Sequence, residues 1–389
     1  MSPHDLDHEL AKIDAAHLKR LRRTPENPCG PEMVLEGRTF VAFASNDYLG
    51  LANDPALKTG AIAAIEAWGV GAGASQLVSG RLGIFDELEQ RLAEFAQREA
   101  ALFFPSGFQA NLGVLTALAD RHDVIFADRV NHASLIDGAL LSRAQHVRYQ
   151  HTDVDDLKHK LDSTPVAADG TRLIVTDSVF SMDGDEAPLA RLLELAERYD
   201  AWLIVDDAHG LGVLGPQGRG SIADAGLPPH PNLIMIGTLG KAAGVSGAFV
   251  AGQRNVIEWL IQRARSYIYT TGPSPMIAGA LLASIERIRQ GDALRMRLQK
   301  NIAQLREGIA DLNLPFKLLP SRTGIQALVI GDNAHTLKMS QHLLAQGYWV
   351  PAIRPPTVAP GSARLRISLS AAHTTAHIVG LLNALGQIA

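Results

Sequence analysis

A lysine and a threonine stand on a glycine-rich turn at residues 237–241, which read GTLGK. The turn follows the apolar run LIMI, so it lies where a buried strand would end. Backbone N–H groups and the hydroxyl of Thr238 can surround a phosphate in such a turn, and the amine of Lys241 can bond to a carbonyl carbon. The spacing is not that of a P-loop. Taken alone, a solvated lysine on a flexible turn would be the default interpretation.

A carboxylate and an imidazole follow a second apolar run, WLIV. Asp206 and His209 lie three residues apart there, although an aspartate in that place can simply cap a helix. Pyridoxal 5'-phosphate (PLP) chemistry needs a lysine, an acid for the pyridine nitrogen, a flat ring partner and donors for the phosphate. Lys241, Asp206 and a histidine ring would supply the first three. Thr238 and the turn at Gly107 would supply the last, so the combination predicts a PLP site.

The elements that must position these groups alternate between helices and short buried strands, which is typical of an α/β domain with a largely parallel sheet. Three apolar runs each end in polar residues, and they cover residues 172–176, 202–205 and 233–236. Ligands of open α/β sheets gather beyond the carboxyl ends of the strands. We therefore expect Asp177, Asp206 and Thr238 to be neighbours.

The chain is expected to have three parts. They are an N-terminal segment at 1–45, a large PLP-binding α/β domain at 46–285 and a C-terminal α+β domain at 286–389. A helical pattern covers about residues 4–24. In the large domain, a strand at 101–104 leads through a turn into a helix at about 109–119.

The composition narrows the function classes. A net charge of −4 and 20% charged residues give no basic stripe of the kind that nucleic-acid binding requires. Cys29 is the only cysteine, so no intramolecular disulfide or cysteine-based zinc site can form, and a reducing compartment fits best. The N-terminus lacks an apolar signal-peptide core, and no run approaches the roughly 20 apolar residues of a membrane span. We expect a cytoplasmic protein without a metal, nucleic-acid or membrane partner.

Several segments, spread over nearly the whole chain, carry a specific combined pattern. They are SNDYLGL (45–51), GAGASQLVSG (71–80), SGFQAN (106–111), NHAS (131–134), DSVFSMDGD (177–185), DDAHGLGVLGPQGRG (206–220), GTLGKA (237–242), AIRPPTV (352–358) and ARLRIS (363–368). Together they resemble the α-oxoamine synthases, a fold-type I family of PLP-dependent transferases. The resemblance implies a large, mostly parallel-sheet domain and a smaller C-terminal α+β domain.

The resemblance also implies roles for the cofactor site. Lys241 would hold PLP as a Schiff base and then remove the α-proton of the amino acid. Asp206 would pair with the pyridinium nitrogen, and His209 would bond to the phenolic oxygen. His132 would stack on the ring and face the substrate. Further cofactor contacts would come from Gly107, Phe108, Ser181 and Thr238.

The substrate residues implied by the resemblance lie near both ends of the chain. Asn46 and Arg366 would bind the amino-acid carboxylate, because the planar fork of arginine suits carboxylates. Arg22, Arg354 and Thr357 would lie near the acyl chain or its product. For Arg22 the alternative is strong, since the charge run at residues 19–23 would ordinarily form a solvated face.

The resemblance implies a homodimer with a shared active site. Ser75, Thr270 and Thr271 would reach the phosphate across the dimer interface. Within the family, the chain is most similar to the branch that serves biotin synthesis, in which L-alanine condenses with a pimeloyl thioester and CO₂ and a thiol are released. Whether coenzyme A or an acyl carrier protein carries the acyl group stays open.

Three alternative functions compete with this interpretation. The first is a glycine- or serine-using family member, such as glycine C-acetyltransferase, 5-aminolevulinate synthase or a sphingolipid-type acyltransferase. The second is an inactive partner subunit, which the presence of Lys241, Asp206 and His209 disfavours. The third is a nucleotide-binding dehydrogenase, but GAGAS at 71–75 lacks a full GxGxxG and follows no clear strand.

Three positions depart from the usual family pattern, namely Gln76, Phe85 and Ala243. They leave the acyl-chain preference and loop packing open.

Overall fold

The computed structural model describes residues 5–387, and the chain divides into two compact units. The central unit comprises Leu49–Ser181 and Asp185–Arg295. The terminal unit comprises Met1–Tyr48, Met182–Gly184 and Met296–Ala389, so both ends of the chain build one unit. The domain boundaries expected from the sequence stay a prediction. Residues 1–4 of the expected N-terminal segment and residues 388–389 of the expected C-terminal domain lie outside the described range.

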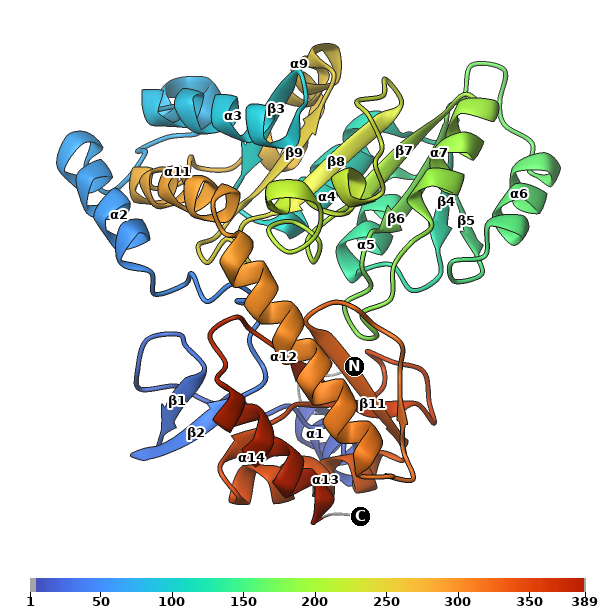
Figure 1. The fold of residues 1–389 in the computed structure, drawn as a ribbon. Coiled ribbons are helices and arrows are strands. Elements are labelled where there is room, and N and C mark those ends of the chain that lie inside the picture. Colours follow the sequence, from blue (N-terminus) through green and yellow to red (C-terminus); the bar gives the residue numbers. More distant parts are fainter. Residues whose placement is uncertain (1–4, 388–389) are drawn as a thin grey trace. The chain divides into compact units, whose positions relative to one another are not determined.

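A seven-stranded sheet forms the middle of the central unit (Figure 1). Its strands are β3 (Ala100–Phe104), β4 (Val124–Asp128), β5 (Gln145–Tyr149), β6 (Arg172–Asp177), β7 (Ala201–Asp206), β8 (Leu233–Thr238) and β9 (Ala248–Gly252). Their order is β3-β9-β8-β7-β6-β4-β5, and only β9 runs antiparallel to its neighbours. The α/β fold class with a largely parallel sheet is confirmed.

Helices surround this sheet. They are α2 (Pro55–Trp68), α3 (Gly83–Ala96), α4 (Gly107–Leu118), α5 (Ala133–Ser142), α6 (Val154–Ser163), α7 (Leu189–Arg198), α8 (Ser221–Asp224), α9 (Arg254–Arg263), α10 (Arg265–Ile268) and α11 (Pro275–Arg289). The short segments η2 (Gln76–Gly80) and η3 (Pro216–Gly218) complete the unit. The π-helical segment η2 lies in the glycine-rich region at 71–80.

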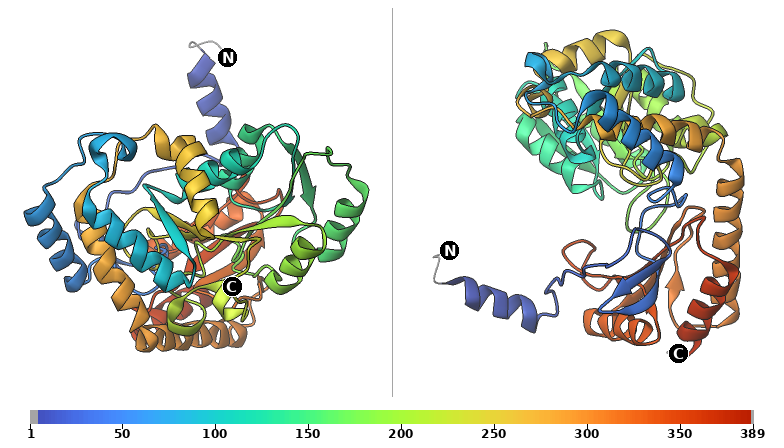
Figure 2. Two further views of the ribbon diagram at one scale, coloured as in Figure 1. Left: turned by 90° about the horizontal axis from the view of Figure 1, so that it is seen from above. Right: turned by 90° about the vertical axis from the view of Figure 1, so that its left-hand side faces the viewer.

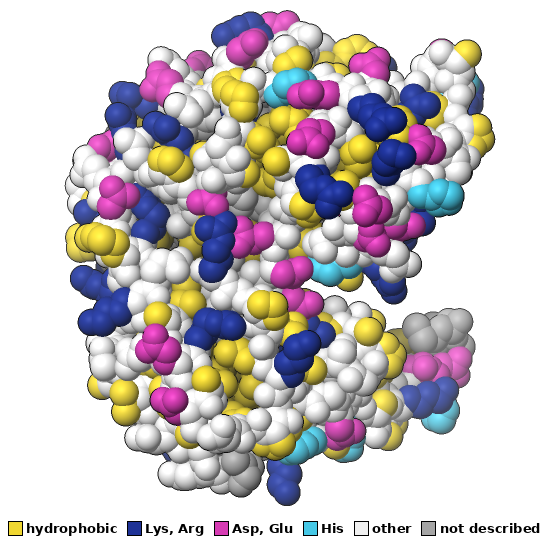
Figure 3. Space-filling view, turned by 45° about the vertical axis from the view of Figure 1, so that its right-hand side comes forward, with side chains coloured by type: hydrophobic (Ala, Val, Ile, Leu, Met, Phe, Trp, Pro, Cys, Tyr) yellow, Lys and Arg dark blue, Asp and Glu magenta, His cyan; other side chains and the backbone are white. Residues whose placement is uncertain are grey.

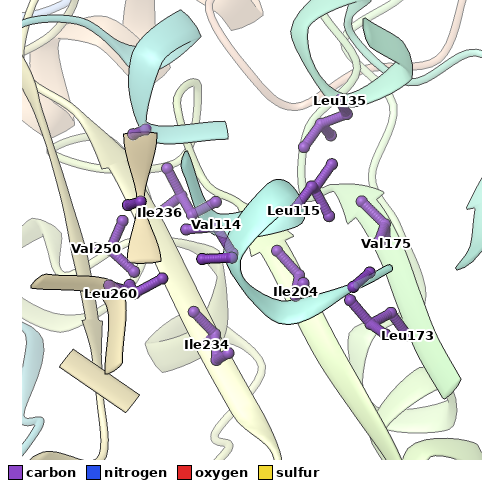
Figure 4. Close-up of a cluster of buried hydrophobic side chains, with 14 of the residues drawn as sticks. Val114, Leu115, Leu135, Leu173, Val175, Ile204, Ile234, Ile236, Val250 and Leu260 are labelled. Atoms are coloured by element: carbon purple, nitrogen blue, oxygen red, sulfur yellow. The ribbon is translucent and has the colours of Figure 1, made fainter. Parts of the chain in front are cut away.

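A buried apolar cluster fixes one face of the sheet (Figure 4). Val114 and Leu115 of α4 pack there with Ile204 of β7. The other face is covered at β3, where Phe103 contacts Phe85 of α3 with ring centroids 5.5 Å apart. Burying each large side chain contributes about 1.5–3 kcal/mol, so the strand ends are held on a rigid support.

The terminal unit contains two small sheets. One consists of β1 (Glu32–Leu35), β2 (Arg38–Ala42) and β12 (Tyr348–Trp349), and the other of β10 (Lys317–Leu318), β11 (Ile325–Gly331), β14 (Ala363–Ser368) and β13 (Ala352–Ile353). Its helices are α1 (Leu6–Ala15), α13 (Asn333–Ala345), α14 (Thr375–Gly386) and, from Met296 onward, α12 (Asp292–Asp311). β2 pairs with β1 antiparallel and with β12 parallel, which ties the N-terminal segment to the C-terminal one.

The N-terminal helix is shorter than its sequence pattern predicts. The pattern covers about residues 4–24, of which residue 4 lies outside the described range, but α1 ends at Ala15 and His17 has a positive φ of 56°. No residue of α1 is buried, and Figure 2 shows the helix lying apart from the sheets of its unit. The prediction was wrong for the second half, because Leu21 and the other leucines of the pattern stay exposed among the described residues instead of covering an apolar surface.

The described surface carries acidic and basic side chains in a mixture. Figure 3 shows both signs interspersed over one face of the molecule. Within residues 5–387, no helix combines the length and the apolar character that crossing a membrane would demand.

Candidate active site

Three strand ends gather polar groups at one edge of the central sheet. Asp177 of β6 is directly paired with Asp206 of β7, and Asp206 is paired with Ile236 of β8, two residues before Thr238. The strands end here because each buried apolar run gives way to residues that cannot be buried without partners. The three residues therefore lie at neighbouring strand ends, as their positions in the sequence predict.

Lys241 and His209 meet beyond this edge. The Nζ atom of Lys241 lies 2.8 Å from Nε2 of His209. Backbone bonds hold the lysine turn, since Leu239 N–H donates to Gly247 O at 2.8 Å and Gly244 N–H donates to Lys241 O at 2.8 Å. An imidazole at this distance can exchange a proton with the lysine amine.

Asp206 is held in place by an asparagine that the sequence reasoning missed. Asn111 of α4 donates from Nδ2 to Asp206 Oδ2 at 2.7 Å and to Ser134 Oγ at 2.8 Å. The other oxygen, Asp206 Oδ1, accepts the N–H of Ala208 at 3.0 Å. Asn111 belongs to the SGFQAN segment, so the motif itself carried the signal.

The neighbouring carboxyl group of Asp177 is also buried. Burial, and then the negative charge of Asp206, raises the pKa of Asp177 well above its ordinary range. Its Oδ2 accepts the backbone N–H of His132 at 2.7 Å, which fixes the start of α5 beside the strand end. Asp177 thus positions His132 through its backbone N–H.

His132 stands at the N-cap of α5 as an exposed residue. Its Nδ1 lies 2.7 Å from Ser134 Oγ and accepts the N–H of Ser134 at 3.3 Å. Desolvation lowers the pKa of the imidazole, Asp206 opposes the shift and Lys241 supports it. A neutral imidazole at this edge can cover an aromatic ring without adding a positive charge.

A second missed residue, Asp207, organises the loop that carries His209. Its fully buried carboxylate accepts hydrogen bonds from Ser178 Oγ at 2.6 Å and from Ser221 Oγ at 2.6 Å and N at 2.9 Å. Burial raises the pKa of Asp207 to about 7. A Cβ atom at Gly210 or Gly220 would collide with this carboxylate, so the glycines of the segment are required by packing.

The phosphate end of the predicted cofactor site has the expected donors. Gly107 begins α4 so close to Thr238 that a Cβ atom there would lie 2.7 Å from Thr238 Oγ1. The helix N-terminus and the threonine hydroxyl therefore face the same small space, a combination that favours anions. Phe108 is 45% exposed beside it, and Ser181 lies half-buried in the loop after β6.

The residues predicted to act across a dimer interface lie together in the central unit. Ser75 and Thr271 form an isolated antiparallel bridge, and Gly272 N–H donates to Ala74 O at 2.8 Å. Thr270 precedes this bridge and is half-buried. Their role toward a second subunit stays a prediction.

In the terminal unit, Arg366 and Asn46 meet. Arg366 donates from Nη2 to Asn46 Oδ1 at 3.1 Å and from Nη1 to Ser368 Oγ at 2.6 Å. Tyr48 also donates its hydroxyl to Asn46 Oδ1, at 3.1 Å, and burial raises the pKa of this tyrosine. Arg366 is thus oriented by β14 and by the segment before the central unit.

The remaining predicted substrate residues are less fixed. Arg354 donates to the carbonyl oxygen of His17, and its pKa is lowered by burial and by Arg20. Thr357 is exposed and donates its N–H to Arg354 O at 3.1 Å. Arg22 is exposed after α1, in a segment without helix or strand. The structure joins Arg354 with Thr357.

The three departures from the family pattern lie inside the central unit. Gln76 is buried, and its amide atoms find no hydrogen-bond partner among the described residues. Phe85 fills the core against Phe103, and Ala243 is buried beneath Ser284, whose hydroxyl donates to its carbonyl oxygen at 2.7 Å.

The donor set fits PLP. Lys241 supplies an amine, Asp206 a buried carboxylate, His132 an uncharged ring, and Thr238 with the α4 N-terminus supplies phosphate donors. Asn111 Oδ1 is a buried oxygen without a hydrogen-bond partner among residues 5–387. Buried oxygens normally accept a hydrogen bond, so this one can accept a bond from a ligand at the site. The arrangement can bind an aldehyde cofactor and move a proton at its lysine.

Comparisons with known proteins identify the family. The family model "Aminotransferase class I and II" matches residues 38–385. The 8-amino-7-oxononanoate synthase of Herminiimonas arsenicoxydans is 55% identical over 381 residues, covering 97% of both chains. That of Aromatoleum aromaticum is 56% identical over 385 residues, covering 98% of this chain and 97% of the relative.

Solved structures agree. A PLP-containing serine palmitoyltransferase from S. paucimobilis matches with a TM-score of 0.91 and 30% identity, covering 98% of this chain and 96% of that one. The 8-amino-7-oxononanoate synthase of Francisella tularensis matches with a TM-score of 0.76 and 33% identity, covering 90% and 97%. The expectations of a fold-type I architecture and of PLP as cofactor are confirmed. The chain therefore belongs to the 8-amino-7-oxononanoate synthase family of PLP-dependent acyltransferases.

Proposed function

We propose that the protein condenses L-alanine with a pimeloyl thioester to give 8-amino-7-oxononanoate, CO₂ and a free thiol, in biotin synthesis. The observation that carries the proposal is the approach of Lys241 Nζ to His209 Nε2 at 2.8 Å, beyond the strand that ends in Asp206. The names of relatives above 50% identity support the choice of substrates.

The proposed chemistry divides among residues of the chain. PLP, when bound, supplies an electron sink for negative charge at the α-carbon of the amino acid. Lys241 Nζ removes the α-proton and later returns a proton, and His209 Nε2 lies within proton-transfer distance of this amine. A general base positioned in this way typically contributes about 10²- to 10⁴-fold to the rate.

The other residues bind and orient. Asp206, fixed by Asn111, holds negative charge for the pyridine nitrogen, and the ring of His132 covers one face. We propose that Arg366 and Asn46 bind the carboxylate of L-alanine, because a guanidinium fixed by Ser368 presents its donors in a planar fork. Arg22, Arg354 and Thr357 are proposed for the acyl chain.

The substrate proposal is tested on the purified protein loaded with PLP. L-alanine, glycine and L-serine are added singly while the visible absorption band is recorded, and each is then assayed with pimeloyl-CoA and with a pimeloyl carrier protein. We expect a shift selective for L-alanine and a product with the mass of 8-amino-7-oxononanoate. A shift and product with glycine or serine alone would instead place the protein with the sister synthases.

Lys241→Ala provides the matched control for this assay. The variant is expected to lose both turnover and the visible band of the bound cofactor. Condensation at wild-type rate in the variant would contradict the assignment of Lys241.

We also propose that the active enzyme is a cytoplasmic homodimer with shared sites. The single cysteine supports a reducing compartment. The β-bridge between Ser75 and Thr271 holds these two residues side by side, which supports a joint role at the dimer interface. Mixing Lys241→Ala with a Ser75→Ala/Thr271→Ala variant tests the sharing. Activity should return in the mixture, because one site of each mixed dimer is intact; no recovery, despite proven subunit exchange, would argue for separate sites.

A further inference from the structure

We propose that His151 is a positioning residue of the active site: its imidazole joins the loop that leads to His132 with the loop that carries Ser181. The inference rests on the proposed function for the roles of these two residues. All of the contacts that carry it lie in the central unit.

One ring nitrogen holds the first loop. His151 follows β5, and its Nδ1 lies 3.0 Å from Oδ1 of Asp128, the last residue of β4. The carboxylate of Asp128 is buried and also accepts the N–H of Val130 at 2.9 Å and of Thr152 at 2.8 Å. This carboxylate therefore fixes the turn that runs into His132.

The other ring nitrogen holds the second loop. His151 Nε2 lies 2.7 Å from Oδ2 of Asp185. The carbonyl oxygen of Asp185 accepts the N–H of Phe180 at 2.9 Å, and Val179 bridges Glu186, so the two ends of this loop are closed onto each other. Ser181 follows Phe180 directly.

The ring of Phe180 makes a third contact. It stands edge-on to the imidazole, with centroids 4.3 Å apart and planes at 88°. An imidazole held by two carboxylates and one aromatic ring has no freedom to rotate, and His151 is only 27% exposed. The two loops are thus related through one rigid group.

The protonation of the ring suits this role. Both nitrogens face carboxylates, and only the imidazolium can donate to two acceptors at once. Burial lowers the pKa of His151, but the hydrogen bonds and charges of Asp128 and Asp185 outweigh it and raise the pKa to about 9. Both bonds are therefore charge-assisted at neutral pH.

Two substitutions separate the two bonds. Asparagine places its amide nitrogen near the position of Nδ1, and glutamine places its own near Nε2. His151→Asn should keep the bond to Asp128 and lose that to Asp185, and His151→Gln should do the reverse. A role in general stability alone would not separate the two loops in this way.

The first readout is amide hydrogen exchange of the full chain without PLP, followed by mass spectrometry. His151→Asn should accelerate exchange in residues 178–187 by roughly tenfold or more, because it removes one charge-assisted hydrogen bond. Exchange in residues 128–134 should stay within about twofold of the wild-type rate. His151→Gln should accelerate 128–134 instead. The control is His159→Asn, the same substitution at an exposed position of α6. It should not change hydrogen exchange in either segment.

The second readout is the PLP-loaded enzyme. Both His151 variants should alter the circular dichroism of the cofactor band and lower kcat about tenfold, with KM for L-alanine within about threefold. If His151→Asn fails to fold, Asp185→Asn replaces it, because it weakens the same bond, and it should accelerate only residues 178–187.

Clear results would overturn the proposal. Unchanged exchange in both loops would do so, as would equal acceleration of both loops by both variants, because then His151 only adds stability. If the substrates were assigned wrongly, the exchange and dichroism results would still hold while the alanine assay failed, so the two failures are distinguishable.

Discussion

Asp177 and Asp206 stand directly opposite each other at the carboxyl ends of β6 and β7, and both side chains are buried. Two neighbouring buried carboxyl groups resist being charged together. Since burial and the charge of Asp206 raise the pKa of Asp177, the pair divides its work: Asp177 takes up a proton more readily and supports the backbone N–H of His132, while Asp206 is held by Asn111.

This division predicts unequal effects of the same substitution. Asp177→Asn keeps an oxygen acceptor for the backbone N–H of His132 and should leave kcat/KM within about tenfold. Asp206→Asn removes the charge held by Asn111 and should lower kcat/KM by about a hundredfold or more and weaken PLP binding. Steady-state kinetics and PLP titration check both, and equal losses in the two variants would show that the division is wrong.

Gly107→Ala should weaken PLP binding. The added Cβ atom would lie 2.7 Å from Thr238 Oγ1, so the hydroxyl must move away from the phosphate site. Overpacking of this kind costs about 1–3 kcal/mol, which corresponds to about 5- to 150-fold in the PLP dissociation constant. In Gly252→Ala, the new atom would find its nearest neighbour at 3.8 Å, so this buried glycine is the control. Equal PLP affinities of Gly107→Ala and the wild-type protein would argue against a phosphate site between the α4 N-terminus and Thr238.

Arg366→Lys should raise KM for L-alanine by about ten- to a hundredfold with a small change in kcat, because lysine cannot reproduce the bonds to Asn46 and Ser368 together. Arg364→Lys is the comparison on the same strand. It weakens the ion pair with Asp183 and should lower the melting temperature without a specific rise in KM. A rise in KM of equal size in both variants would contradict a carboxylate site at Arg366.

His373 should make the protein sensitive to acid. The ring is buried, stacks on Phe43 at 4.4 Å and accepts the N–H of Ser370 at 2.9 Å, and burial lowers its pKa to about 4. Because the folded pKa lies below the ordinary value of 6.5, the stabilisation is complete above about pH 6.5 and is lost as the pH falls toward 4.

Calorimetry of His373→Asn between pH 4 and 8 checks this prediction. The variant should melt at a lower temperature near pH 7.5, since the stacking on Phe43 is lost, and its melting temperature should fall less steeply toward pH 4. His159→Asn should keep the wild-type slope. A parallel pH dependence in wild type and His373→Asn would contradict the assignment.

The central strands were predictable because β6, β7 and β8 are buried on both faces and read as continuous apolar runs. Boundaries depended on local bonds. The helix expected from about residue 109 begins at Gly107, because the hydroxyl of Ser106 accepts the N–H of Gln109 and caps the helix. The pairing of β2 with β12 left no local trace, since it joins segments from opposite ends of the chain.

The site residues also fall into a group that the sequence predicted and a group that it did not. Motifs marked Lys241, Asp206 and His209, because their chemistry is legible from residue type and spacing. Asn111 and His151 were missed, since their importance comes from partners far along the chain, at Asp206 and Asp185. A buried amide or an imidazole between two carboxylates becomes visible only when the strands bring its partners together.

The pairing of Val41 with Tyr348 also bears on how the protein is made. β1 and β2 precede the other strands along the chain, but β12 is translated only after the whole central unit. The seven strands of the central sheet can pair while synthesis continues, because domains generally fold as units from the N-terminal side. During that interval β2 presents an unpaired edge to other nascent chains. The first strands of this enzyme are therefore among the last to have their pairing completed.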